Sequence, residues 1–259
     1  MAREARRLLI APARLGAVGA DRLLPLEPAE AHYLRRVLRQ RAGARIELVD
    51  GRGSLWSAAL EPDGRLRLEQ AAERPLRREP PPAPPLTLAL ALPRRDTELV
   101  WRMACELGVD RLQPLLAVRG VVAGRLPVER WRAVLREATE QCERLWLPAL
   151  AEAMPAEAWL SAPRAGPGLI AVTRRAGLPP LGAWLAGAGS LRPEEPVSLA
   201  IGPEGGWSEA EEAAALAAGW QAVSLGSTIL RCSTAAVAGV ALLAAGRQLS
   251  GSPSPSPSS

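Results

Sequence analysis

The chain has 259 residues and a formal net charge of +5, with 32 basic residues, all of them arginine, against 27 acidic ones. This length accommodates one large domain, or a small domain followed by a medium one. No stretch holds the roughly 18 uninterrupted apolar residues that a membrane helix needs, and the apolar stretch near the N-terminus is too short for a secretory signal. We therefore expect a cytoplasmic protein with no membrane partner.

The sequence contains three cysteines that lie far apart, no CxxC pair and a single histidine, His32. This composition argues against a disulfide framework and against a zinc site, so we expect no metal. The charge is unevenly distributed. Residues 1–79 hold 16 Arg against 11 Asp and Glu, and residues 80–259 hold 16 of each kind. A basic module joined to a neutral one suits an enzyme that handles RNA, although a merely solvated basic surface would have the same composition.

Residues 73–86 read ERPLRREPPPAPPL and contain six prolines, which favour an extended linker. We place a domain boundary there, with a first domain over residues 1–79 and a second over residues 80–249. The last ten residues, SGSPSPSPSS, offer nothing to bury and predict a disordered tail over residues 250–259.

The first domain alternates short strands with turns, at residues 45–49, 55–60 and 65–68, which predicts the hairpins of a small β-barrel. A helix is expected from Pro28 through EAHYLRRVLRQ. Its spacing places four apolar residues on one face, Ala31, Leu34, Val37 and Leu38. It places four basic residues on another, His32, Arg35, Arg36 and Arg39. That basic face could grip phosphates or could be an ordinary exposed helix face.

The second domain alternates strands with helices, which predicts a parallel sheet covered by helices. Strands are expected at residues 86–92, 112–118, 169–173, 197–201 and 222–225, and helices at about 96–107 and at 128–144. A capping box, Ser208 with Glu211, marks the start of a later helix. The final helix, from Ser233 to about Gly246, is apolar almost all round, so we expect it to be buried.

Two strands run directly into glycine-containing loops and then into helices, as VSLAI-GPEGGW-SEAEE and AVSL-GSTILR-CSTAA. Such strand ends are where parallel sheets bind ligands, and glycine permits close approach of the backbone. The loops could hold a flat heterocycle, or they could be tight turns without a ligand. Neither loop matches GxxxxGK[ST] or GxGxxG, and the single histidine argues against a hydrolase triad.

Six segments taken together resemble the RsmE family of 16S rRNA uridine-N3 methyltransferases, which belongs to the SPOUT superfamily. They are, in this order, HYLRRVLR, ELVDG, ELGVDRLQPL, EATEQCER, IGPEGGWSEAE and LGSTILRCSTAA, and the resemblance covers nearly all of residues 5–249. The resemblance implies an α/β SPOUT-type domain with a parallel sheet and a C-terminal trefoil knot, preceded by a PUA-like β-barrel that binds RNA. It also implies the cofactor S-adenosyl-L-methionine, a homodimer, and methylation of N3 of a uridine in the decoding region of 16S rRNA, as naked RNA or in the assembled small ribosomal subunit.

Carried onto this chain, the resemblance implies cofactor contacts from both loops and from the end of an earlier strand. The implied residues are Thr173, Ile201, Gly202, Pro203, Glu204, Gly205, Gly206, Leu225, Gly226, Ile229, Leu230 and Arg231. The implied RNA-binding residues are His32, Arg35, Arg36, Arg39 and Arg144.

We assign a catalytic role to Arg231, which would stabilise the developing anion on the base or clamp the substrate backbone. No general base is evident. The chain departs from the family pattern at Ser233, where a glutamate is customary, and at Met103, where a lysine is frequent. Two alternatives therefore stay open: a SPOUT-fold RNA-binding or ribosome-assembly protein with impaired catalysis, and a SPOUT methyltransferase that modifies another base or a ribose hydroxyl.

Overall fold

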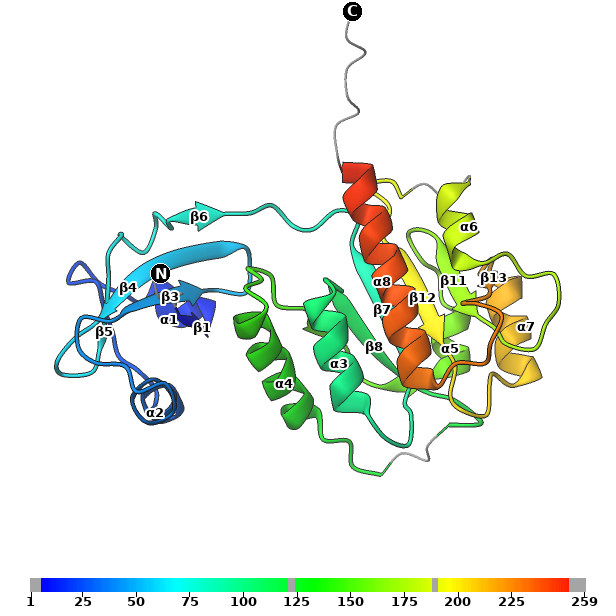
Figure 1. Ribbon diagram of the computed structural model, residues 1–259, viewed down its shortest axis with the longest axis horizontal. Helices are drawn as coiled ribbons and strands as arrows, with labels where there is room; N and C mark the ends of the chain where they lie inside the picture. The colour runs from blue at the N-terminus through cyan, green and yellow to red at the C-terminus, as the bar shows by residue number, and fades with distance from the viewer. Residues whose placement is uncertain (1–5, 121–123, 188–190, 252–259) are drawn as a thin grey trace, which may run out of the picture. The chain divides into compact units, whose positions relative to one another are not determined.

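The computed structural model describes residues 6–120, 124–187 and 191–251 (Figure 1). The chain forms two compact units. Unit 1 contains Met1–Pro81 and Arg136–Leu147, and unit 2 contains Pro82–Leu135 and Pro148–Ser259. Of the tail predicted over residues 250–259, residues 250 and 251 belong to the final helix instead, and the rest lies outside the described residues.

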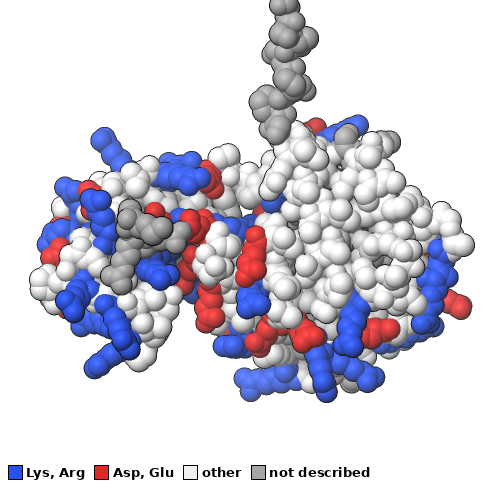
Figure 2. Space-filling model, viewed as in Figure 1, with Lys and Arg blue, Asp and Glu red and all other residues white. Residues whose placement is uncertain are grey.

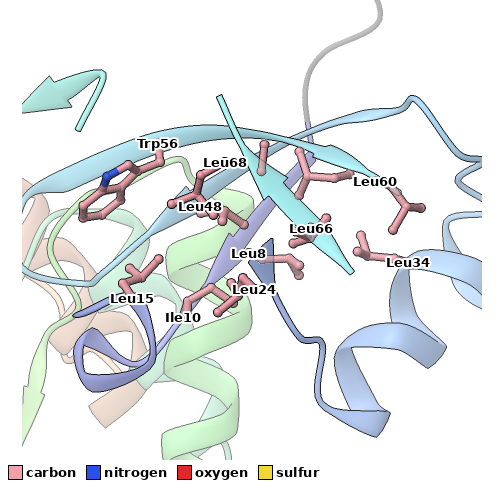
Figure 3. Close-up of a cluster of buried hydrophobic side chains, with 12 residues drawn as sticks. Leu8, Ile10, Leu15, Leu24, Leu34, Leu48, Trp56, Leu60, Leu66 and Leu68 are labelled. Atoms are coloured by element: carbon pink, nitrogen blue, oxygen red, sulfur yellow. The ribbon is translucent and has the colours of Figure 1, made fainter. Parts of the chain in front are cut away.

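Unit 1 is built on a six-stranded sheet with the order β1-β3-β4-β5-β2, in which β6 also pairs with β4. Its strands are β1 (Arg6–Leu9), β2 (Leu23–Leu24), β3 (Arg45–Val49), β4 (Ser54–Leu60), β5 (Leu66–Leu68) and β6 (Arg77–Arg78). The pair β1 and β3 is parallel and the other pairs are antiparallel. Leucines from these strands and from α1 (Pro12–Gly16) converge on one core with Trp56 (Figure 3). The three expected strands are therefore confirmed within one residue at each end.

The expected helix after Pro28 is present but changes form in its second half. It begins as α2 (Pro28–His32) and continues as a π-helix, η1 (Tyr33–Val37), in which the N–H of Leu38 donates to the carbonyl of Tyr33. The wider π turn rotates later side chains away from the face predicted with 3.6 residues per turn. Leu34 is buried as expected, but Val37 is 58% exposed, so its assignment to the apolar face was wrong.

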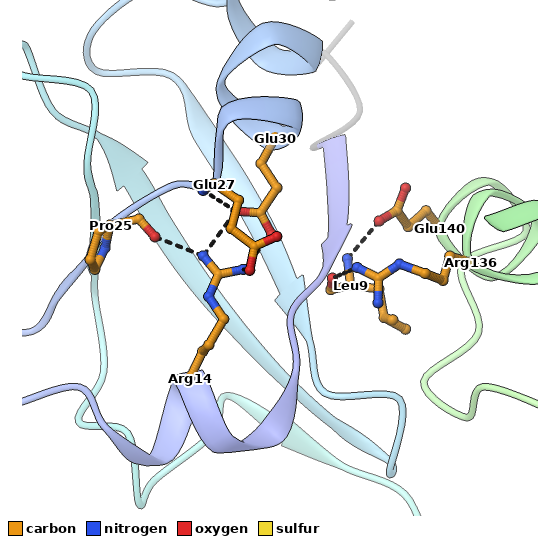
Figure 4. A network of polar contacts seen from close by, with 7 residues as sticks. All are labelled: Leu9, Arg14, Pro25, Glu27, Glu30, Arg136 and Glu140. Atoms are coloured by element: carbon orange, nitrogen blue, oxygen red, sulfur yellow. Dashed lines mark hydrogen bonds and ion pairs between the residues drawn. The ribbon is translucent and has the colours of Figure 1, made fainter. Parts of the chain in front are cut away.

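The segment Arg136–Leu147 packs in unit 1, although the sequence boundary left it in the second domain. Figure 4 shows one of its contacts, made to Leu9 of β1. The N–H of Leu9 donates to Glu140 Oε1 at 2.8 Å, and Arg136 Nη2 donates to the carbonyl of Leu9 at 2.7 Å. Leu145 then joins an apolar cluster with Leu9 and two other unit 1 residues. The two hydrogen bonds join residues more than a hundred positions apart, so no local sequence pattern predicts them.

Unit 2 contains a seven-stranded sheet in which every pair is parallel. The strand order is β10-β8-β7-β12-β11-β13, and β9 also pairs with β8. The strands are β7 (Leu86–Ala91), β8 (Arg111–Leu116), β9 (Ala149–Leu150), β10 (Met154–Pro155), β11 (Gly168–Ala171), β12 (Val197–Ile201) and β13 (Gln221–Val223). The central strands β7 and β12 are almost entirely buried, as is usual for a parallel sheet covered on both faces.

Helices cover both faces of this sheet. On one face α8 (Cys232–Gly251) contacts β7, β12, α3 (Thr97–Glu106) and α6 (Leu181–Ala186). On the other, α5 (Ala156–Ser161) packs against α7 (Glu209–Ala217) over a cluster that includes Trp220. The helix α4 (Val128–Gln141) contains the division between the two units. The alternation of strands and helices expected from the sequence is thus confirmed.

The final helix α8 is less buried than the sequence predicted. Leu242 is 38% exposed and Leu249 is 80% exposed, because α8 is the outer layer of unit 2 and only one of its faces meets the sheet. By length and composition α8 is also the one helix among the described residues that could cross a membrane. A core helix that packs on a sheet meets the same criteria, and α8 contacts β7 and β12. Near its end, Arg247 binds Asp110 at 2.6 Å and the carbonyl of Gly108 at 2.7 Å, which fixes α8 to the sheet layer.

Candidate functional site

A cavity of about 1080 Å³ lies in unit 2, where several parallel strands end. Its walls come from the loops after β11, β12 and β13, with Arg119 added from the loop after β8. Carboxyl ends of parallel strands meet at one edge of a sheet, so four loops that are distant in sequence converge here. The volume is slightly above the roughly 300–1,000 Å³ typical of small-molecule sites.

The loop after β12 is held in place from several sides. A Cβ atom on Gly202 would lie 3.1 Å from the ring of Trp207, so glycine lets the indole pack directly on the backbone. Trp207 Nε1 donates to the carbonyl of Ala171 at 3.1 Å, which joins this loop to β11. Glu204 Oε1 accepts a hydrogen bond from the backbone N–H of Arg94 at 3.1 Å. The loop is therefore a fixed wall of the cavity.

The helix that follows this loop starts with the capping box expected from the sequence. Ser208 Oγ accepts from the N–H of Glu211 at 3.2 Å, and Glu211 Oε2 accepts from the N–H of Ser208 at 2.8 Å. The same buried carboxylate also accepts from the N–H of Val118 at 2.8 Å. Glu211 thus ties the loop after β8 to the start of α7.

The loop after β13 forms the opposite wall. Gly226 has φ of +143°, a backbone conformation that glycine adopts without strain. Leu230 is half-buried, whereas Ile229 is 63% exposed and presents an apolar side chain at the cavity. Arg231 is exposed and lines the same space.

Cys232 lies just after this loop and contributes a buried thiol. Its Sγ lies 3.7 Å from the carbonyl of Ala91, to which it donates. Burial, with a smaller contribution from the negative charge of Glu204, raises the pKa of Cys232 to about 12. The thiol therefore stays protonated at neutral pH and is unsuited to act as a thiolate nucleophile.

All twelve residues that the sequence placed at the cofactor site line this one cavity, from Thr173 to Arg231. Sequence reasoning missed Arg119 and Arg174, which also line it. Trp207, the last residue of the first loop as the sequence delimits it, lines the cavity as well. Arg119 could have been found from its place after a parallel strand, but only once the strand order was known.

The five residues assigned to RNA binding lie in unit 1. His32, Arg35, Arg36 and Arg39 are exposed on α2, η1 and the residues that follow. Arg144 lies in the segment Arg136–Leu147. In the described part of the chain, no group of three or more His, Cys, Asp or Glu residues is arranged to hold a metal ion.

Comparison with known proteins gives matches to both units. Residues 79–244 match the model of an RNA methyltransferase domain, and residues 26–69 match that of an RNA methyltransferase PUA domain. The chain is 37% identical over 241 residues to ribosomal RNA small subunit methyltransferase E of a Synechocystis strain, which covers 89% of this chain and 74% of that protein.

The chain belongs to the RsmE family of RNA methyltransferases.

Solved structures agree with this assignment. A ribosomal RNA small subunit methyltransferase E from Neisseria gonorrhoeae, bound to S-adenosyl methionine, superposes with a TM-score of 0.75 at 28% identity, over 93% of this chain and 97% of that one. A methyltransferase from Legionella pneumophila with the same cofactor gives a TM-score of 0.79 at 25% identity, over 94% and 98%. The fold class predicted from the sequence, a SPOUT-type α/β methyltransferase domain preceded by a PUA-like domain, is confirmed.

Proposed function

We propose that this enzyme transfers a methyl group from S-adenosyl-L-methionine to N3 of a uridine in the decoding region of 16S rRNA. The observation that carries the proposal is the convergence of all twelve assigned residues on one cavity at the ends of parallel strands. The related ribosomal RNA small subunit methyltransferase E from Neisseria gonorrhoeae binds the same cofactor.

The residues of the cavity fit that cofactor. Leu225, Leu230 and the buried Ile201 supply apolar walls for an adenine ring, and the glycine loop after β12 offers backbone groups without side chains in the way. Ile229 and Thr173 extend these walls. Bound here, the cofactor supplies an electrophilic methyl group carried on its sulfonium.

The chain's own residues must orient the uridine and accommodate the charge that forms on it. Forming the bond from N3 to the methyl carbon requires loss of the N3 proton, which places negative charge on the carbonyl oxygens of the base. We assign the stabilisation of this charge to Arg231, whose exposed guanidinium lines the cavity and forms no ion pair among the described residues. The proton acceptor is left unassigned, since the cavity contains no histidine.

Unit 1 provides the features expected of an RNA-binding module. It carries 18 arginines against 14 acidic residues once Arg136–Leu147 is included. Many of these arginines pair with carboxylates, as Arg7 does with Glu47. Arg35, Arg36 and Arg39 form no ion pair in the part of the chain that the structure describes, so their charges are available to phosphates. We assign the contact with rRNA to this face, with His32 and Arg144.

The enzyme is further proposed to act as a cytoplasmic homodimer. Figure 2 shows that the surface over α8 carries few charged side chains, and exposed leucines lie along this helix. A second copy of the chain would cover such a face, as in an isologous dimer. Light scattering at micromolar concentration is expected to give a dimer, and a monomer would contradict this part of the proposal.

The proposed reaction is tested by mass spectrometry of rRNA digests, in which nucleosides identify the methylated atom and oligonucleotides identify its position. Small-subunit rRNA from a strain that lacks this enzyme is incubated with the purified protein and S-adenosyl-L-methionine, then digested. We expect one new 3-methyluridine within the decoding region. A methyl group on a ribose or on another base would support the alternative target, and no methylation despite RNA binding would support an assembly protein in which Ser233 marks lost catalysis.

A further inference from the structure

Four arginines line the cavity, and they differ in whether they form an ion pair with a carboxylate. Arg175 Nη1 binds Glu212 Oε1 at 2.7 Å, so its charge is neutralised locally. Arg231 is the residue assigned above to the reacting base. The remaining two, Arg119 and Arg174, are exposed and pair with no carboxylate among residues 6–120, 124–187 and 191–251. Their charges need another partner.

Arg119 is held against the loop after β12. Its Nη1 donates to the carbonyl of Trp207 at 3.1 Å, and its Cβ lies 3.0 Å from the position that a Cβ atom on Gly205 would take. A guanidinium has five N–H donors in a fixed plane, and one bond to a carbonyl leaves most of them available. The side chain is thus positioned in advance and can still bind an anion.

Arg174 lies in the loop after β11, directly after Thr173. Its φ of +60° is in the left-handed region, which is uncommon for a residue with a side chain. No hydrogen bond of its side chain is found in the described part of the chain, which leaves the whole guanidinium free.

The strand order separates these two arginines. Arg119 follows β8 and Arg174 follows β11, and these strands are three interstrand spacings apart in the strand order β8-β7-β12-β11. This corresponds to roughly 14 Å between the strand ends, at about 4.8 Å a spacing. The side chain of Arg119 crosses part of that distance, because its Nη1 reaches the carbonyl of Trp207 in the loop after β12. Arg119 and Arg174 thus come from opposite sides of this loop in the strand order, and two phosphates of one strand can occupy two such positions.

We propose that Arg119 and Arg174 bind backbone phosphates on the two sides of the target nucleotide and so guide a single RNA strand across the cavity. This inference rests on the proposed function, because it takes the RNA to be the substrate whose base enters the cavity. Contacts of this kind fix the register of the strand and carry no sequence information.

The test is the salt dependence of binding to unmodified 16S rRNA made by in vitro transcription. Each phosphate contact contributes roughly 0.7 to the slope of log K against log salt concentration for a single strand. Arg119→Gln and Arg174→Gln are expected to lower the slope by about 0.7 each, and the double variant by about 1.4. The matched control is Arg175→Gln combined with Glu212→Gln, which removes an ion pair at constant net charge and is expected to leave the slope unchanged.

A second measurement separates phosphate binding from support of the loop. Calorimetry with S-adenosyl-L-methionine is expected to give the wild-type affinity for both single variants. The inference is overturned if the double variant keeps the wild-type salt slope, or if Arg119→Gln weakens cofactor binding without changing the slope. Neither readout requires methyl transfer, so failure of the wild-type protein to form 3-methyluridine would count against the proposed function alone.

Discussion

The two units use the same residue type, arginine, in different structural settings. In unit 1 the arginines assigned to RNA, Arg35, Arg36 and Arg39, lie on or just after a short helix that changes from α to π form, outside a sheet with a mainly leucine core. In unit 2 Arg119, Arg174 and Arg231 lie on loops at the ends of buried parallel strands, around a cavity. The topology of the sheet therefore positions the unit 2 residues, whereas local helix geometry positions those of unit 1.

The largest expected effect is on the cavity residue nearest to the proposed chemistry. Arg231→Ala is expected to lower kcat by about 10²–10³-fold, because the variant has no preorganised cation at the developing charge. Single-turnover methylation measures this, with rRNA affinity measured in parallel. Full activity with unchanged rRNA affinity would remove Arg231 from the mechanism, and a loss confined to affinity would make it a backbone clamp.

The next largest expected effect is a loss of stability in unit 2, caused by a substitution that does not change the charges of unit 1. Arg247→Met removes a charged hydrogen bond to Asp110 in a pair in which both side chains are only 15% exposed, together with the bond to the carbonyl of Gly108. We expect the free energy of unfolding to fall by roughly 1–3 kcal/mol in urea titrations. Arg192→Met is the control, since the Arg192 to Glu195 pair is largely exposed and should contribute less than about 1 kcal/mol. Equal losses for both variants would contradict this interpretation of the Arg247 pair.

A smaller effect is expected at the basic face of unit 1. Replacing Arg35, Arg36 and Arg39 by glutamine should lower the salt slope of rRNA binding by about 0.7 for each phosphate that this face no longer binds. Affinity for S-adenosyl-L-methionine should not change, because the cavity belongs to unit 2. Arg65→Gln is a suitable control, since Arg65 already binds Asp63 at 2.7 Å. If the triple variant keeps the wild-type slope, this face does not bind RNA.

Much of unit 2 could be predicted from its sequence, because buried strands, a capping box and glycine loops each leave a local signature. Ser208 and Glu211 form the predicted cap, and the loops that follow Ile201 and Leu225 meet as expected. The part played by Arg119 depends on strand order, which no local pattern encodes. In unit 1 the π turn moved Val37 to the surface, since helical periodicity assumes 3.6 residues per turn.

The smallest expected effect is on stability, at the contact between Glu140 and Leu9 that joins Arg136–Leu147 to the rest of unit 1. Burial raises the pKa of Glu140, partly offset by its hydrogen bond from Leu9. Such a carboxyl group has a higher pKa in the folded than in the unfolded protein. It therefore lowers the free energy of unfolding as the pH rises from the ordinary pKa of 4.5 through the folded pKa. Glu140→Gln keeps an oxygen for Leu9 and removes the charge, so at pH 7 the free energy of unfolding should be unchanged or higher by up to about 1 kcal/mol.

The matched variant Glu140→Ala should instead lose roughly 1–3 kcal/mol, because the N–H of Leu9 is left without its acceptor. Urea titrations at pH 4 and pH 7 measure both variants. A decrease of more than about 1 kcal/mol for the glutamine variant at pH 7 would show that the charge itself stabilises unit 1.

The central claim is that the cavity in unit 2 binds S-adenosyl-L-methionine, and calorimetry with a cavity-filling variant tests it most directly. Ala235 lines the cavity from the first turn of α8, outside the two loops, so the ring in Ala235→Phe should project into the space that the cofactor would occupy and leave both loops intact. We predict one cofactor bound per wild-type chain and no heat of binding for Ala235→Phe, with the same thermal unfolding midpoint within a few degrees. A wild-type protein that does not bind the cofactor, or a variant that binds it as tightly as the wild type, would contradict the account.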